Sequence, residues 1–474
     1  MVATDRDPKV PEDLKVRGEG PYPGVTQGSQ PGMTRPGTKT DVDGRGWRKG
    51  IRPAALAAVL VVACSAGRPS SSAPGLSGQR LEVAAVWSGV EQRHFELVLR
   101  EFTRQTGVSA TYTSAGYGVP AFLAARLAQG RPPDVAFLPQ PGLLRRYAAE
   151  HRLVPLDDIA GHTVADNYSP AWRRLGSVGG TLYGVWFKAA DKSLIWYNED
   201  VFERAGMVPP TDVGALVLLE HRLAGLGVSA FAVGGADGWT LADWFSNIYL
   251  RLAGPVRYDL LAAHRIAWTD PSVTAALRQL ARVLRPRFIA GGARGALRTS
   301  YAESVQETFA SRPAAAMVFE GDFVAGIISG QTRAQLGVDA DALSFPAAGR
   351  SAPMLVAGGD AAVLMRRSTA GDALIRFLAS PQAAAIWAAR GGFVSPNINL
   401  GLSAYPDGLN RSIARSLLEA AGNFRFSLSD LTPAGFGGTE GRGMRGILQQ
   451  FLARRDASTT AARLEQAARQ AYRR

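Results

Sequence analysis

Apolar runs and helical periodicity alternate along the chain from residue 81 onward. An apolar run at residues 81–87 predicts a strand, and apolar positions at helical spacing over 94–107, ended by Gly107, predict a helix. The segments 108–113, 121–130 and 134–138 continue the pattern as strand, helix and strand, the last after a turn at 131–133. This alternation predicts an α/β fold, in which a mainly parallel sheet has helices on both faces.

The ends of these strands indicate where a ligand would bind. In parallel α/β sheets ligands lie beyond the carboxyl ends of the strands. Trp87, Tyr117 and Gln140 follow three predicted strand ends, and Glu91 lies just after Ser88-Gly89 at the first of them. Each could equally serve as a cap, surface or packing residue, so the four are candidates only.

The segment before residue 81 has a different pattern. An apolar run at 53–63 follows Arg45, Arg48, Lys49 and Arg52, and it is shorter than the ~20 residues that span a bilayer. This is the layout of a secretory signal, and residues 61–64 resemble the bacterial lipobox, which would make Cys64 a lipid attachment point. The alternative is a buried free cysteine. We therefore predict a disordered or mis-annotated extension at 1–44, a lipoprotein signal peptide at 45–63 and a Ser/Gly/Pro linker at 64–79.

Charge and cysteine content narrow the function. The formal net charge is +13, but the basic residues are spread along the chain without a basic run or a stacking aromatic array, so we expect a solvated surface and no nucleic acid partner. Cys64 is the only cysteine, which excludes a disulfide within the chain. After residue 81 no Pro/Gly/Ser-rich linker marks a domain boundary, which favours two lobes connected by more than one chain crossing.

From residue 81 to residue 472 the chain resembles a known family. The resemblance rests on eight segments in the family's order, among them YGVWFKAADKSLIWYNEDVFERAG (183–206), GGADGWTLADWFSNIYLRLAGP (234–255), FLASPQAAAIWAARGGFVSPN (377–397) and LTPAGFGGT (431–439). These are similar to the extracellular solute-binding proteins of bacterial ABC sugar importers, and more narrowly to their alpha-glucoside branch.

The resemblance implies a two-lobe periplasmic-binding-protein-like fold of type II. By analogy, the lobes comprise 80–188 with 360–430, and 189–359 with 431–474, each a mainly parallel sheet flanked by helices. Such a protein closes on a carbohydrate and docks on the membrane permease of the importer. The lipidated cysteine would hold it at the extracellular face of the cell membrane, and we expect a monomer without metal or cofactor.

Sugars bind to aromatic faces and to paired polar groups, and several segments offer both. Asp237 and Trp239 lie in an expected loop, whereas Trp244 has a helical pattern and could be core. Glu320 and Asp322 flank Gly321 in an expected loop and could be sugar ligands or a solvated turn. The remaining candidates are Gly358 and Asp360, in an expected hinge, and Phe436, which the resemblance suggests as a second aromatic platform.

Only two lysines follow Cys64, at positions 188 and 192, although the rest of the chain is rich in arginine. Arginine and lysine are not interchangeable, so we predict that Lys188 donates to the ligand in the cleft. Lys192 is expected to be hinge packing or a surface charge. A chance pair of codons is the alternative for both.

An extracellular glycoside hydrolase is the alternative function, because glycosidases also combine aromatic residues with two carboxylates. The pairs Glu320/Asp322 and Asp237/Asp360 could serve in that way. The five histidines show no metal-ligand spacing, and the sequence has no GxSxG motif. A Gly-x-Gly-x-x-Gly motif at 441–446 follows a glycine-rich loop instead of a strand, which argues against a dinucleotide site.

Overall fold

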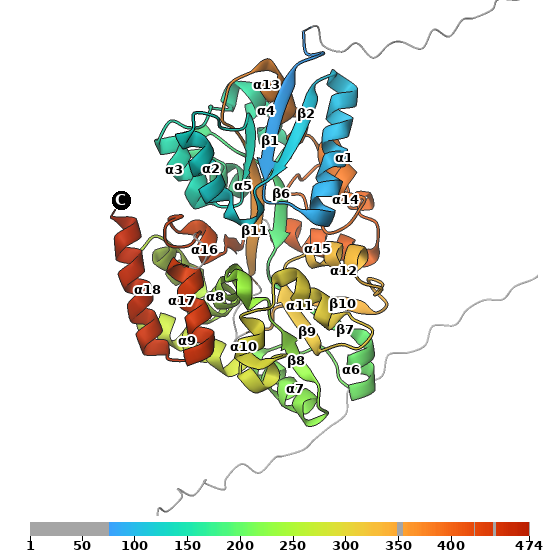
Figure 1. The fold of residues 1–474 in the computed structure, drawn as a ribbon, viewed down its shortest axis with the longest axis vertical. Coiled ribbons are helices and arrows are strands. Elements are labelled where there is room, and N and C mark those ends of the chain that lie inside the picture. Colours follow the sequence, from blue (N-terminus) through green and yellow to red (C-terminus); the bar gives the residue numbers. More distant parts are fainter. Residues whose placement is uncertain (1–74, 348–353, 421, 439–441, 474) are drawn as a thin grey trace, which may run out of the picture. The chain divides into compact units, whose positions relative to one another are not determined.

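A computed structural model describes residues 75–347, 354–420, 422–438 and 442–473 (Figure 1). The predictions for residues 1–44, for the signal peptide at 45–63 and for Cys64 lie outside these residues, as does most of the predicted linker. In the part of the chain that is described, every helix is too short or too polar to cross a membrane.

A six-stranded sheet forms the centre of what we call the first lobe (Figure 1). Its order is β12-β11-β3-β1-β2, with β6 also paired to β11. β1 pairs in parallel with β2 and β3, and β11 pairs in parallel with β12 but antiparallel with β3 and β6. The strands are β1 (Arg80–Ala85), β2 (Ser109–Ser114), β3 (Val135–Leu138), β6 (Val185–Asp191), β11 (Leu355–Leu364) and β12 (Phe424–Phe426).

The helices of the first lobe follow the predicted alternation. A strand, helix, strand, helix and strand succeed one another from β1 to β3, which confirms the pattern predicted for residues 81–138. The helices are α1 (Gly89–Thr106), α2 (Val119–Ala128), α3 (Pro141–Ala149), α4 (Asp157–Asn167), α5 (Pro170–Leu175), α13 (Thr369–Leu378), α14 (Pro381–Ala388) and α15 (Gly408–Glu419), with the short pair β4 (Ser177–Val178) and β5 (Thr181–Leu182) and the 3-10 turns η1 (Gly116–Gly118) and η4 (Leu402–Ala404).

A four-stranded sheet of order β10-β7-β9-β8 forms the centre of the second lobe. β8 and β9 are parallel, whereas β7 is antiparallel to both of its neighbours. The strands are β7 (Leu194–Asn198), β8 (Ser229–Ala232), β9 (Ala315–Glu320) and β10 (Ala340–Ser344). The helices are α6 (Glu199–Ala205), α7 (Val213–Gly225), α8 (Trp239–Ala262), α9 (Pro271–Val283), α10 (Gly292–Ala296), α11 (Tyr301–Thr308), α12 (Val324–Gln331), α17 (Gly443–Arg454) and α18 (Ala457–Tyr472), with η2 (Gly235–Asp237) and η3 (Pro286–Phe288).

Local signals explain where several helices begin and end. Gly107 ends α1 in a left-handed conformation with φ of 73°, which glycine adopts without steric cost. Asp270 caps α9 by accepting a hydrogen bond from the backbone N–H of Ser272. Gly254, with φ of 75°, and the following Pro255 interrupt the helical geometry of α8.

The chain passes between the two sheets at three places. It leaves β6 at Asp191 and enters β7 at Leu194, it returns from β10 to β11, and it leaves the first sheet again after β12 into α16 (Leu428–Leu431). The buried apolar residues form two clusters, one around the six-stranded sheet and one around the second lobe with α17 and α18. The two sheets, each with its own core, are therefore joined by more than one chain crossing.

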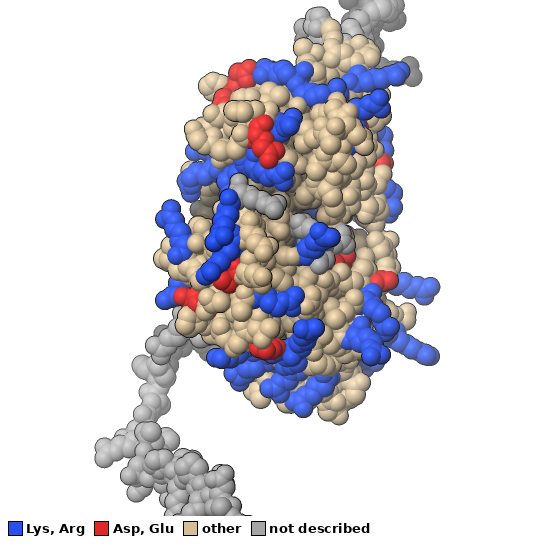
Figure 2. Space-filling model, turned by 60° about the vertical axis from the view of Figure 1, so that its left-hand side comes forward, with Lys and Arg blue, Asp and Glu red and all other residues tan. Residues whose placement is uncertain are grey.

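Basic side chains are distributed over the surface, as the sequence predicts. Figure 2, in which lysine and arginine share one colour, shows basic side chains over both the upper and the lower parts of one face, with fewer acidic ones between them. Lys188 is 3% exposed and the side chain of Lys192 is 13% exposed, and these are the only lysines in the described residues. The exposed cations of this part of the chain are therefore arginines.

Candidate functional site

A cleft of about 880 Å³, part of it open to solvent, lies between elements of the two lobes. The first lobe contributes residues that follow β1, β2 and β3, and β6, β11 and the connections contribute others. The second lobe contributes the first residues of α8 and α11, the residue before α12 and one residue of α17. The lining residues are Val86, Trp87, Ser88, Glu91, Tyr117, Pro120, Pro139, Gln140, Lys188, Ala190, Lys192, Trp239, Tyr301, Phe323, Gly359, Asp360, Asp430 and Arg445.

Seven of the residues singled out from the sequence line this cleft: Trp87, Glu91, Tyr117, Gln140, Lys188, Trp239 and Asp360. Three of them follow strand ends of the six-stranded sheet, which is where the ligand site of such a sheet is expected. The other six candidates lie behind the cleft wall or in the core.

Aromatic rings from both lobes meet across the cleft. Tyr117 of η1 is 45% exposed, and its ring centroid lies 5.7 Å from that of Trp239 on α8. Tyr301 and Phe323 of the second lobe pack around the same indole, with centroids 5.4 and 6.0 Å from it. Flat apolar faces of this kind suit the C–H faces of a sugar ring.

Trp239 lies at the first position of α8, so the expectation that it lies in a loop is wrong. Gly238, with φ of 70°, turns the chain from η2 directly into the helix. Asp237, the last residue of η2, accepts a hydrogen bond of 2.6 Å from the backbone N–H of Tyr301. Asp237 thus positions the backbone of a residue that lines the cleft and does not line the cleft itself.

Trp87 is 1% exposed, so little of its indole reaches the cleft. Its ring packs at 4.7 Å from Phe137 and 4.8 Å from Phe95 between centroids. The indole Nε1 donates to Asp360 Oδ2 at 3.2 Å. Trp87 therefore orients a carboxylate that lines the cleft.

Lys188 of β6 forms an ion pair with Glu91 of α1, and its ammonium lies 5.5 Å from the centroid of Phe323. Burial by itself lowers the pKa of Lys188, but the carboxylates of Glu91, Asp360 and Asp322 outweigh burial and raise it. Burial raises the pKa of Asp360 to about 6, against the opposing effect of Lys188. The cleft thus contains a permanently charged ammonium next to a carboxyl group that titrates near neutral pH.

Lys192 also lines the cleft, and the expectation of a surface charge is wrong for it. Its Nζ lies 3.1 Å from Asp243 Oδ2 on α8 and 3.1 Å from Asp430 Oδ2 on α16. The same ammonium lies 5.5 Å from the ring centroid of Trp239. The carboxylates of Asp243 and Asp430 raise its pKa although burial opposes them.

Trp244 and Phe436 lie in the core of the second lobe and do not line the cleft. Trp244 packs at 4.4 Å from Phe319 between ring centroids, and Phe436 is fully buried against Trp268 at 5.1 Å. Trp239 and Trp244 are five residues apart, which places them about 140° apart around the helix. One side of α8 therefore faces the cleft while the other faces the core.

Glu320, Asp322 and Gly358 lie behind the cleft lining. Glu320 ends β9, is 1% exposed, and its carboxylate accepts no hydrogen bond from any described residue. Burial, together with the nearby carboxylate of Asp243, raises its pKa well above the usual value. Asp322 Oδ1 accepts from the backbone N–H of Asp191 at 2.8 Å, and burial raises the pKa of Asp322 to about 7.

Among the charged and aromatic residues that line the cleft, sequence reasoning missed five: Lys192, Tyr301, Phe323, Asp430 and Arg445. Four of them belong to segments that reach the cleft only through the packing of the second lobe or the third connection. The exception is Lys192, for which the scarcity of lysine after Cys64 was already a signal.

The fold and the cleft define a two-lobed receptor that holds its ligand between the lobes. The chain belongs to the family of bacterial extracellular solute-binding proteins, whose family model matches residues 88–385. Among the described residues no group of three or more His, Cys, Asp and Glu side chains could hold a metal ion.

Two curated relatives extend over most of the chain. The osmoprotective compounds-binding protein GgtB of Synechocystis sp. is 34% identical over 394 residues, which cover 79% of this chain and 91% of the relative. The alpha-glucosides-binding periplasmic protein AglE of Rhizobium meliloti is 31% identical over 378 residues, which cover 76% and 81%. Both relatives are named as binding proteins.

Solved structures share the fold at lower identity. The bacterial solute receptor AcbH, described as preferring β-D-galactopyranose, aligns with a TM-score of 0.72 at 21% identity over 83% of this chain and 98% of the receptor. The raffinose complex of RafE aligns with a TM-score of 0.67 at 14% identity over 83% and 99%. These similarities confirm the two-lobe periplasmic-binding-protein-like fold that the sequence predicts.

Proposed function

We propose that this protein captures a carbohydrate outside the cell and delivers it to the membrane permease of an ABC importer. An alpha-glucoside or a small oligosaccharide is the proposed ligand class. The observation that carries the proposal is the cleft between the lobes, where Tyr117 and Trp239 face each other from opposite lobes next to the carboxylates of Glu91 and Asp360. The name of the relative AglE, an alpha-glucosides-binding protein, supports the same ligand class.

A thermal-shift screen of the purified protein against a sugar panel tests this proposal. The panel contains alpha-glucosides, beta-linked disaccharides, raffinose-type oligosaccharides and free hexoses. A ligand present at about 100 times its Kd adds about 2.7 kcal/mol to the free energy of unfolding. We expect at least one alpha-glucoside to raise the melting temperature in a concentration-dependent way, and a panel without any such sugar would overturn the proposal.

The comparisons do not support the alternative of an extracellular glycoside hydrolase. Glu320 and Asp322 lie behind the cleft lining, and Asp237 is engaged with the backbone of Tyr301. The relatives AglE and GgtB are named as binding proteins, and the family is one of solute-binding proteins.

We also propose that the protein is a monomeric lipoprotein, attached through Cys64 at the extracellular face of the membrane. The lipobox-like residues 61–64 support the attachment. Cys64→Ala is then expected to release the protein from the membrane fraction, and a variant that stays bound after a high-salt wash would contradict the anchor. Light scattering of the released protein tests the monomer.

The lobe boundaries that we propose are those predicted from the sequence, 80–188 with 360–430 and 189–359 with 431–474. They divide β6 and β11, the two strands of the first sheet that lead to the second sheet or return from it. The positions of β7 in the second sheet and of β12 in the first are consistent with them. A sugar-dependent decrease of the radius of gyration in solution scattering would support hinged closure of these lobes.

A further inference from the structure

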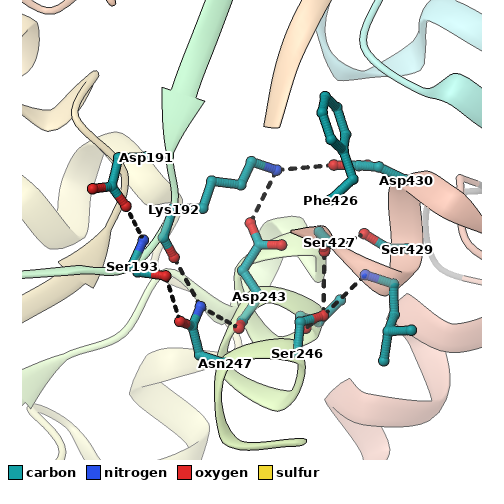
Figure 3. A network of polar contacts seen from close by, with 12 residues as sticks. Asp191, Lys192, Ser193, Asp243, Ser246, Asn247, Phe426, Ser427, Ser429 and Asp430 are labelled. Carbon is teal, nitrogen blue, oxygen red and sulfur yellow. Dashed lines mark hydrogen bonds and ion pairs between the residues drawn. The ribbon is translucent and has the colours of Figure 1, made fainter. Parts of the chain in front are cut away.

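One side chain, that of Lys192, contacts elements at all three connections between the lobes. Lys192 is the residue after β6, on the first connection. Its ammonium lies 3.1 Å from Asp430 Oδ2 on α16, which follows the third connection, and 3.1 Å from Asp243 Oδ2 on α8. Figure 3 shows the ammonium between these two carboxylates.

The second connection is reached through Gly358 of β11. A Cβ atom at Gly358 would lie 2.5 Å from Cε, 3.1 Å from Cδ and 3.3 Å from Nζ of Lys192. The stem of Lys192 therefore lies directly on the backbone of β11, in space that only a glycine leaves open. The contact with Lys192 explains why residue 358 is a glycine, a position that the sequence had suggested as part of the ligand site.

Backbone hydrogen bonds fix the segments around this lysine. Lys192 N donates to Val356 O at 2.9 Å, and Val356 N donates to Ser193 Oγ at 2.8 Å. Ser193 Oγ donates to Asn247 Oδ1 at 2.7 Å, and Asn247 Nδ2 donates to Lys192 O at 2.8 Å (Figure 3). α8 thus holds the first two connections through Asn247, one turn after Asp243.

The third connection meets the same helix. Leu428 N donates to Ser246 Oγ at 3.1 Å, and Ser246 Oγ lies 3.4 Å from Ser427 Oγ. These contacts are buried beneath the cleft, whereas Lys192 lines it. Lys192 and its partner Asp430 are therefore the members of the network that line the cleft, and of the two it is Lys192 that contacts all three connections.

The chemistry of lysine suits this place. An ammonium has three donors in a compact group. That of Lys192 donates a hydrogen bond of 3.1 Å to Asp430 Oδ2 and forms an ion pair with Asp243 from another direction, which leaves a donor for the cleft. A planar guanidinium would direct its donors as a fork and would need more room beside Gly358 and the ring of Trp239.

We propose that Lys192 is a positioning residue that couples the three interlobe connections to the occupancy of the cleft. In the closed arrangement its ammonium holds α16 and α8 together across β11, and a ligand that accepts its remaining donor strengthens the same arrangement. This proposal rests on the proposed function only for the chemical class of the ligand, because Lys192 contacts the three connections whether or not a ligand is bound.

Two variants perturb this coupling in different ways. Lys192→Met keeps the apolar stem and removes the charge. Gly358→Ala keeps the charge but displaces the stem, which is the flexible partner in that contact. When Gly358→Ala is added to Lys192→Met, the new methyl group displaces a side chain that forms no ion pair. The double variant therefore shows whether Gly358→Ala acts by breaking the ion pairs of Lys192 or by general destabilisation.

The measurements are the radius of gyration without ligand, the dissociation rate of a sugar that stabilises the wild type, and the melting temperature. We expect both single variants to have a larger ligand-free radius of gyration than the wild type and a dissociation rate at least tenfold higher. Adding Gly358→Ala to Lys192→Met should change the dissociation rate less than twofold. Lys188→Met is the matched control, because Lys188 is also buried in the cleft but pairs with Glu91 of the first lobe; it should lower affinity without changing the ligand-free radius.

An unchanged ligand-free radius in both variants would overturn the proposal, even if sugar affinity fell, because Lys192 would then be a ligand contact only. Fully additive effects of the two substitutions would overturn it as well. If no sugar binds the wild type, the proposed function fails, whereas the ligand-free radii still test the coupling.

Discussion

Glu220 on α7 has a buried carboxyl group that forms no hydrogen bond with the described residues. It is fully buried, and neither of its oxygens accepts a hydrogen bond from a described residue. Burial raises the pKa of Glu220 from 4.5 to about 9, although Arg285 and Arg287 oppose the shift. The perturbation we suggest is Glu220→Gln, which keeps the shape and removes the titration.

The sign of the effect follows from proton binding. Between pH 4.5 and about 9 the folded chain keeps the proton on Glu220 while the unfolded chain releases it. The free energy of unfolding must therefore fall as the pH rises through this window, by at most about 1.4 kcal/mol per unit. pH 7.5 is about three units above the pKa of the unfolded chain, so the free energy of unfolding of the wild type is about 4 kcal/mol lower there than at acidic pH. The Glu220→Gln variant has no proton to release at this position and does not show this decrease.

Denaturant unfolding followed by tryptophan fluorescence at pH 5, 6, 7, 8 and 9 measures this difference. The free energy of unfolding of Glu220→Gln minus that of the wild type should increase steadily with pH. Glu203→Gln, at an exposed position on α6 of the same lobe, is the control and should run parallel to the wild type. Parallel profiles for Glu220→Gln and wild type would refute the reasoning, whatever the offset between them.

Three further predictions concern the cleft and its closure. Lys188→Arg should weaken sugar binding at least tenfold, about 1.4 kcal/mol by calorimetry, because the wider guanidinium overfills an enclosed site; wild-type affinity would contradict this. Trp239→Ala should lose more binding energy than Trp268→Ala, which removes a ring from the second-lobe core, and equal losses in two folded variants would reject Trp239 as a platform. Gly330→Ala on α12 would place a Cβ 2.7 Å from Val90 Cγ2 of α1, so it should reduce affinity and sugar-dependent compaction, and Val90→Ala in the same chain should restore both.

The first lobe was predictable from the sequence because its signals are local. The apolar runs and the terminating Gly107 define β1, α1 and β2 without reference to the rest of the chain. The second sheet was not predicted in detail. The antiparallel placement of β7 between β9 and β10 depends on segments more than 100 residues away in the sequence, and neither periodicity nor turns encode such pairings.

The site was predictable to the extent that it follows from the first sheet. Trp87, Tyr117 and Gln140 reach the cleft because neighbouring parallel strands end at one edge. Trp244 and Phe436 share the residue type of a sugar platform, but the phase of α8 and the packing against Trp268 turn them inward. The residue types thus identified side chains that suit a sugar. Which of those side chains reach the cleft is determined only by the packing of the two lobes.

The burial of Lys188 and Lys192 has a consequence for the reactivity of this protein. They are the only side-chain amines in the described residues, and both are enclosed and held as ammonium ions by neighbouring carboxylates. Acylating reagents require an accessible neutral amine, so the outer surface of this part of the chain offers them no lysine target. The rate at which an amine-directed reagent labels the two lysines therefore measures how often the cleft opens, and a bound sugar should slow it.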